Sequence, residues 1–87
     1  MKTITGSQVR AARALVRWTA DDLASRSALG IATIRRAEAE DGPISTTAAN
    51  ALAIQRALES GGVLFVDENG GGPGVRLKKS GKPSYEK

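Results

Sequence analysis

The sequence contains no cysteine and no histidine, and its only aromatic residues are Trp18, Phe65 and Tyr85. A chain without cysteine or histidine has no disulfide, no thiol nucleophile, no imidazole for acid–base catalysis and no zinc site of the usual kind. It also has no apolar run of about 18 residues, and residues 1–10 lack the apolar segment of a signal peptide. We therefore expect a cytoplasmic protein that is not an enzyme, holds no metal and no cofactor, and does not enter a membrane.

The length of 87 residues is enough for one small domain. A domain of this size buries only roughly 60% of the surface of its unfolded chain, so self-association would add useful stability. The net charge is +4, but residues 1–75 carry eight basic and eight acidic side chains, so the whole excess lies after residue 75. Such a basic tail could hold phosphates without sequence preference, or it could be a solubilising, disordered end.

Apolar spacing and capping residues predict three helices in the first forty residues. The first begins at Thr5, Gly6 or Ser7 and ends near Arg17, and its apolar positions are Val9, Ala12, Leu15 and Val16. Thr19 is a suitable N-cap for the second, whose first turn contains Asp21 and Asp22, and Gly30 is a suitable N-cap for the third, which runs to about Ala39. In this third helix Ile34 and Ala37 face inward, which leaves the following residues pointing away from the core: Ile31, Ala32, Thr33, Arg35 and Arg36.

A loop and a fourth helix follow. Glycine and proline at 42 and 43 interrupt the chain, and Ser45 or Thr46 can cap a helix that ends near Ser60, before two glycines. Its expected core residues are Ala51, Leu52, Ile54, Ala57 and Leu58.

The stretch from Trp18 to Glu38 resembles the helix-turn-helix of the Cro/phage-repressor-like (XRE) family of DNA-binding proteins. The matching residues are Trp18, Thr19, Leu23, Ala24, Thr33, Ile34, Arg36 and Glu38. The resemblance covers about residues 4–58 and implies a mainly α protein, with a four-helix, lambda-repressor-like helix-turn-helix domain over residues 1–62. Two positions depart from the family pattern: Ala20 replaces a glutamine that often contacts DNA, and Ala28 replaces the turn glycine, which strains the turn if φ there is positive.

The resemblance also implies which residues meet DNA. The residues expected at base edges are Ile31, Ala32, Thr33, Arg35 and Arg36, with Arg36 matching a position that the family uses in this way. Those expected at phosphates are Arg17, Thr19, Gly30, Ser45, Thr46 and Thr47. Arg13 and Glu38 match a partly buried ion pair of the family, so we interpret them as structural.

The residues after the helices are different in character. The apolar run 63–66, the glycine-rich turn and the alternating residues 75–78 predict a C-terminal β-hairpin over residues 63–78, followed by a flexible basic tail at 79–87. Because successive strand residues face opposite sides, one apolar face is left over. The hairpin would either form a dimer interface or cap its own domain. The interface residues would be Val63, Leu64, Phe65, Val66, Val75 and Leu77.

Together these features predict a sequence-specific DNA-binding transcriptional regulator, a homodimer that represses by occupying an inverted repeat in double-stranded DNA through the helix near 30–39. The alternative is a protein-binding helix-turn-helix module, such as an antitoxin or an antiactivator, whose partner would be a toxin or an activator. The balanced charge of residues 1–75 and the alanine at position 20 favour this alternative.

Overall fold

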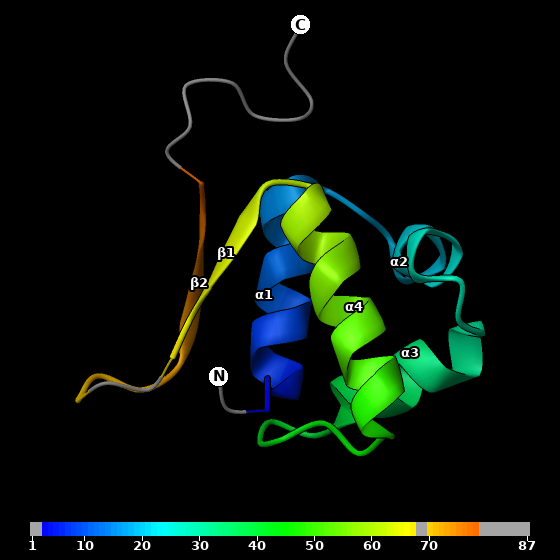
Figure 1. The fold of residues 1–87 in the computed structure, drawn as a ribbon, viewed down its shortest axis with the longest axis horizontal. Helices are drawn as coiled ribbons and strands as arrows, with labels where there is room; N and C mark the ends of the chain where they lie inside the picture. The colour runs from blue at the N-terminus through cyan, green and yellow to red at the C-terminus, as the bar shows by residue number, and fades with distance from the viewer. Residues whose placement is uncertain (1–2, 68–69, 79–87) are drawn as a thin grey trace, which may run out of the picture.

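The computed structural model describes residues 3–67 and 70–78, which form four helices and a two-stranded antiparallel hairpin (Figure 1). The elements are α1 (Gly6–Val16), α2 (Ala20–Ser27), α3 (Ile31–Ala39), α4 (Ala48–Ser60), β1 (Val63–Val66) and β2 (Gly74–Leu77). The prediction of a mainly helical chain that ends in a β-hairpin is confirmed. The expected tail at 79–87 lies outside the described residues. Within the described ranges, no helix combines the length and apolar character needed to cross a membrane.

Side-chain caps fix where the helices begin. The Thr5 hydroxyl accepts the Gln8 N–H at the start of α1, and the Gln8 side chain accepts the Thr5 N–H in return. Thr19 and Asp22 form the same reciprocal pair at α2. The expected start of α4 is wrong: neither Ser45 nor Thr46 is the cap, because Thr47 accepts the Asn50 N–H and the helix begins one or two residues later than expected.

The first two helices each end in a left-handed residue that is not glycine. Arg17 after α1 and Ala28 after α2 both have φ of 61°. The expected strain at Ala28 is therefore confirmed, because an alanine Cβ is disfavoured in this conformation. The chain then reaches Gly30 and enters α3 after a short turn, so α2 and α3 are close neighbours.

The core forms where the four helices meet. Its largest fully buried side chains are Ile4, Val9, Leu23, Ile34, Ile54, Leu58 and Val63. One expected core residue is corrected, because Leu52 is 44% exposed; Leu15, on the apolar side of α1, is 37% exposed. Leu52 precedes Ile54 by two positions, which places it about 200° around the helix, on the face opposite to Ile54.

The hairpin packs on its own helices. β1 pairs with β2 in the register Val63 to Leu77 and Phe65 to Val75, and β1 contacts both α1 and α4. Val63 is fully buried and Phe65 is 7% exposed, so the hairpin face that carries them covers the chain's own helices, and the dimer interface stays a prediction. Both side chains close the core of their own chain, and the Gln8 amide donates to the carbonyls of Val66 and Gly74.

Candidate nucleic-acid interface

Helix α3 presents one buried face and one exposed face. Ile34 and Ala37 are fully buried, whereas Ala32, Arg35 and Arg36 are exposed. Ile31 differs from its expected position, because its side chain is half-buried and packs against the core instead of pointing fully outward. At the start of the helix Gly30 provides no side-chain cap, and a Cβ added there would meet nothing within 4 Å. The N-terminal end of α3 is therefore open to a ligand.

An open groove joins α3 to the start of α4. Two of its lining residues, Thr33 and Arg36, come from α3, and the others come from the following segment: Ser45, Thr46, Thr47 and Asn50. The structure thus brings the expected base contacts at 33 and 36 beside the expected phosphate contacts at 45–47. Asn50 was not predicted. The sequence feature that could have indicated Asn50 is its position three residues after Thr47. In a helix capped by Thr47 this position lies in the first turn, beside the cap.

Three arginines of the described chain are held by intramolecular partners, whereas the two arginines of α3 are not. Arg10, Arg13 and Arg26 are held by intramolecular partners: Arg10 contacts Asp41 and the Glu38 carbonyl, Arg13 contacts Glu38, and Arg26 lies over the Trp18 ring. Arg35 and Arg36 are exposed, and neither forms a hydrogen bond or ion pair with another described residue. Because they are not used within the chain, these two guanidinium groups are available to an external anion or base edge.

The expected ion pair between Arg13 and Glu38 is present. The Arg13 Nε donates to Glu38 Oε2 over 2.6 Å and Nη2 donates to Oε1 over 3.0 Å, with side chains 23% and 10% exposed. A third bond joins Nη1 to the Trp18 carbonyl at 2.9 Å. The hydrogen bond to Glu38 raises the pKa of Arg13, so this residue stays charged at every ordinary pH. The pair ties α3 to α1, and its role is structural.

The start of α2 carries the wrong charge for a phosphate site. Thr19 has its backbone N–H bonded to the Asp22 carboxylate, and Asp21 and Asp22 are both exposed in the first turn. The Thr19 backbone N–H and hydroxyl bonds lower the pKa of Asp22, which keeps this carboxylate ionised at neutral pH. Two carboxylates beside Thr19 oppose the phosphate contact expected there.

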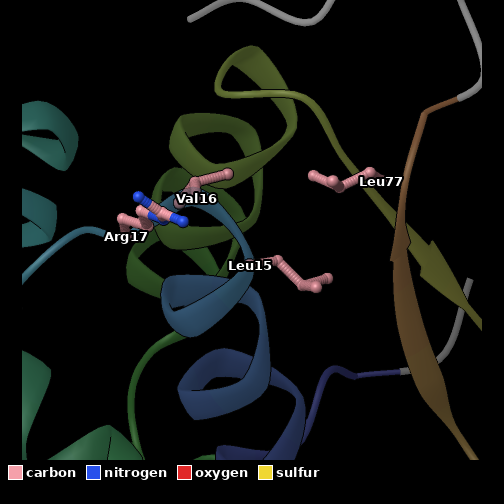
Figure 2. Close-up of a pocket in the computed structure, with 4 residues that line it drawn as sticks. All are labelled: Leu15, Val16, Arg17 and Leu77. Atoms are coloured by element: carbon pink, nitrogen blue, oxygen red, sulfur yellow. The ribbon is translucent and has the colours of Figure 1, made fainter.

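Arg17 lies at the end of α1, outside the groove. It lines a different cleft, with Leu15, Val16 and Leu77, between the end of α1 and β2 (Figure 2). The structure therefore separates Arg17 from the expected phosphate contacts at 45–47. Among the hairpin residues, Leu64 is 37% exposed, Val66 and Leu77 are half-buried, and Val75 packs against the core.

No protein-family model and no curated protein sequence matches the chain. The described residues also include no group of three or more acidic, cysteine or histidine side chains placed to hold a metal ion.

Proposed function

We propose that this protein is a sequence-specific transcriptional regulator that binds double-stranded DNA through α3. In this proposal α2 and α3 are a helix-turn-helix of the XRE kind and α3 is the recognition helix. The observation that supports it best is the groove between α3 and the start of α4, where Arg36 and Thr33 face Asn50 and the hydroxyl side chains at 45–47. A recognition helix contacts base edges, and hydroxyl and amide side chains beside it contact phosphates. This groove contains both kinds of side chain.

The exposed residues of α3 would read the bases. Arg36 is long enough to donate two hydrogen bonds to O6 and N7 of a guanine, and Ala32 can contact a thymine methyl group. Thr33, half-buried in the groove, can bond to a base or a neighbouring phosphate. Arg35, fully on the outside, would reach either a base edge or the backbone. Ile31 contributes little, since it packs partly against the core.

The start of α4 would hold the backbone. Ser45 and Thr47 are exposed, Thr46 and Asn50 are half-buried, and all four line the same groove as Arg36. Hydroxyl and amide groups are common donors to phosphate oxygens, and such contacts set the register of a protein on the duplex. The N-terminus of α3 at Gly30 adds its free backbone N–H groups.

Two copies of the chain would read an inverted repeat. A helix-turn-helix dimer places its recognition helices one DNA turn apart, about 34–36 Å, and a bound dimer over a promoter blocks transcription by occupancy. We therefore propose a dimeric repressor.

The first experiment is selection of bound sequences from a random duplex library with the purified protein. We expect an enriched inverted repeat whose half-sites are one helical turn apart. Binding without an enriched motif would contradict sequence-specific recognition.

The Arg36→Ala variant tests the base contact directly. We expect it to weaken specific binding by roughly 1–3 kcal/mol and to relax the preference at one base pair of each half-site. Arg56→Ala is the matched control, because Arg56 is an exposed arginine of α4 outside the groove. Competition assays on the selected duplex and on single-base variants measure both effects. Equal affinities for wild type and Arg36→Ala would remove Arg36 from the recognition surface.

A second candidate function is protein binding through the same helices, as in an antitoxin or an antiactivator. Asp21 and Asp22 at the start of α2 favour it, because a DNA backbone at that helix end would meet two carboxylates. The library selection separates the DNA-binding regulator from a module that binds protein alone, since such a module would enrich no duplex.

A further inference from the structure

The cleft between the end of α1 and β2 takes no part in the proposed DNA interface. Its volume is about 580 Å³, and its lining residues within the described part of the chain are Leu15, Val16, Arg17 and Leu77. Small-ligand sites in proteins commonly have volumes of about 300–1,000 Å³. The hairpin lies on one side of α1 and α3 lies on the other (Figure 1), so the cleft and the groove beside α3 can be occupied independently.

The cleft is apolar on one side and cationic on the other. Figure 2 shows Leu15 and Leu77 directed toward each other from α1 and β2, whereas Arg17 lies beyond Val16. Leu15 is 37% exposed, and Val16 and Leu77 are half-buried, so these side chains leave apolar surface in contact with water. Covering such surface with an apolar group is favourable. The side of the cleft between Leu15 and Leu77 therefore suits an aliphatic chain.

Arg17 carries the only charge among the described lining residues. Its side chain forms no hydrogen bond, ion pair or ring contact with another described residue, and no acidic side chain of the described part lines the cleft. A guanidinium group stays protonated at every ordinary pH and can donate two parallel hydrogen bonds to a carboxylate. The side of the cleft beside Arg17 therefore suits a carboxylate group.

We propose that this cleft binds a small amphipathic carboxylate, a molecule with one carboxylate group and an aliphatic chain. The carboxylate pairs with Arg17, and the chain lies between Leu15 and Leu77. This inference goes beyond DNA binding and does not rest on it. A cation would be repelled by Arg17, and a sugar would bring several hydroxyl groups to walls that are mainly apolar.

An occupant of the cleft would contact two elements that are far apart in the sequence. Leu15 and Val16 belong to the last turn of α1, and Leu77 ends β2. The two walls come together only when the hairpin is folded against α1, so the ligand binds the folded chain in preference to the unfolded chain. Binding of this kind stabilises the folded state in proportion to the logarithm of the ligand concentration.

The test uses decanoate, below its micelle concentration, and the full-length chain labelled with ¹⁵N. We expect saturable changes in the amide signals of Leu15, Val16, Arg17 and Leu77, together with a melting temperature that rises with decanoate concentration. Decanol has the same chain without the charge, and acetate has the charge without the chain. Each of these two probes should bind at least roughly fivefold more weakly than decanoate.

Two variants of Arg17 test the contact with the carboxylate. Arg17→Gln should raise the dissociation constant of decanoate roughly fivefold and leave that of decanol unchanged, whereas Arg17→Lys, which keeps the charge, should bind decanoate more tightly than Arg17→Gln. Arg56→Gln is the matched control, because Arg56 is an exposed arginine outside the cleft, and it should bind as wild type. Arg17 is itself exposed, and unchanged circular dichroism would show that the fold is kept.

Three results would overturn the proposal: decanoate that gives no saturable binding, equal affinities of wild type and Arg17→Gln for decanoate, and signal changes that lie outside the cleft. The last result would show a general attraction of the anion to basic residues elsewhere in the chain. None of these measurements involves DNA, so their outcome is independent of the library selection that tests DNA recognition.

Discussion

At the scale of single residues, Gly6 lies so close to the backbone of another segment that the position has no room for a side chain. The Gly6 N–H donates to the Gly42 carbonyl over 2.9 Å, and Ile44 donates to Ile4 over 3.2 Å, so the start of α1 lies directly against the segment after α3. A Cβ at Gly6 would lie 1.8 Å from the Glu40 carbonyl oxygen and 2.8 Å from that of Ala37. These are backbone atoms, which cannot rotate away.

Gly6→Ala should therefore lose about 2–4 kcal/mol of unfolding free energy or fail to fold, because α1 and the 40–43 segment must separate to admit the methyl group. Gly30→Ala is the matched control: its φ is −73° and the space around it is open, so we expect only the loss of roughly 1 kcal/mol or less that alanine causes at an N-cap. Urea denaturation followed by the single tryptophan measures both. A Gly6→Ala protein as stable as wild type would contradict the close approach.

The importance of Gly6 could not be predicted from sequence, because its neighbour Glu40 is 34 positions away and no local pattern links the two residues. The sequence identified Gly6 only as one of three helix starts. Ala28 is the opposite case: a short turn between two well-marked helices is a local feature, and the predicted strain is present as a φ of 61°. Arg13 and Glu38 lie between these cases, since only the family resemblance paired them.

At the scale of the elements, the reciprocal cap of α2 contains a contact whose strength depends on pH, because its acceptor is the Asp22 carboxylate. Hydrogen bonds from Thr19 hold the pKa of Asp22 below its ordinary value of 3.8. A carboxylate whose pKa is lower in the folded protein than in the unfolded chain stabilises the fold at any pH above the pKa of the unfolded chain. This stabilisation is lost as the pH falls through the lower pKa of the folded protein.

Asp22→Asn should thus lower the melting temperature at neutral pH, because asparagine can still accept the Thr19 N–H but brings no charge to the helix dipole. The difference from wild type should narrow below pH 3.8 and vanish once Asp22 is protonated in the folded protein. Asp21→Asn is the comparison variant: it removes one negative charge from the same first turn but no Thr19 hydrogen bond, so its smaller effect measures the helix-dipole contribution alone. Parallel melting curves across the acid range measure the effect, and a difference that persists unchanged at the lowest pH would refute an ionic contribution.

The elements also show where sequence reasoning fails. Helices α2 and α3 each follow one clear capping residue, and both were placed correctly. Helix α4 follows Ser45, Thr46 and Thr47, three adjacent residues that can each cap a helix, so only the packed structure selects Thr47. For the hairpin, alternation predicted that Val63 and Phe65 share a face, but not that this face closes the chain's own core. The groove shared by Arg36 and Asn50 is likewise a product of tertiary packing.

At the scale of the whole molecule, the uneven distribution of charge along the sequence assigns specific and nonspecific DNA binding to different segments. Residues 1–75 are balanced in charge, so the net charge of +4 comes from Arg76 onward. The proposed base contacts lie on α3, within the balanced part. Lys79, Lys82 and Lys87 belong to the last nine residues, outside the described part of the chain. In this proposal, recognition and nonspecific phosphate attraction are therefore carried by different segments of the sequence.

Replacing Lys79, Lys82 and Lys87 by glutamine should accordingly weaken binding to random duplex more than it alters the preferred sequence. Each lysine–phosphate pair that is removed reduces the slope of log K against log salt by roughly 0.9, so replacement of all three lysines should flatten the salt dependence by up to about three times that amount. Arg36→Ala changes one side chain of α3 and should instead reduce discrimination between operator and random duplex. Salt titrations of both variants on both duplexes measure the two effects side by side. A tail variant with the wild-type slope would show that these lysines do not touch the phosphates, and the salt dependence would then belong to the groove and to α3.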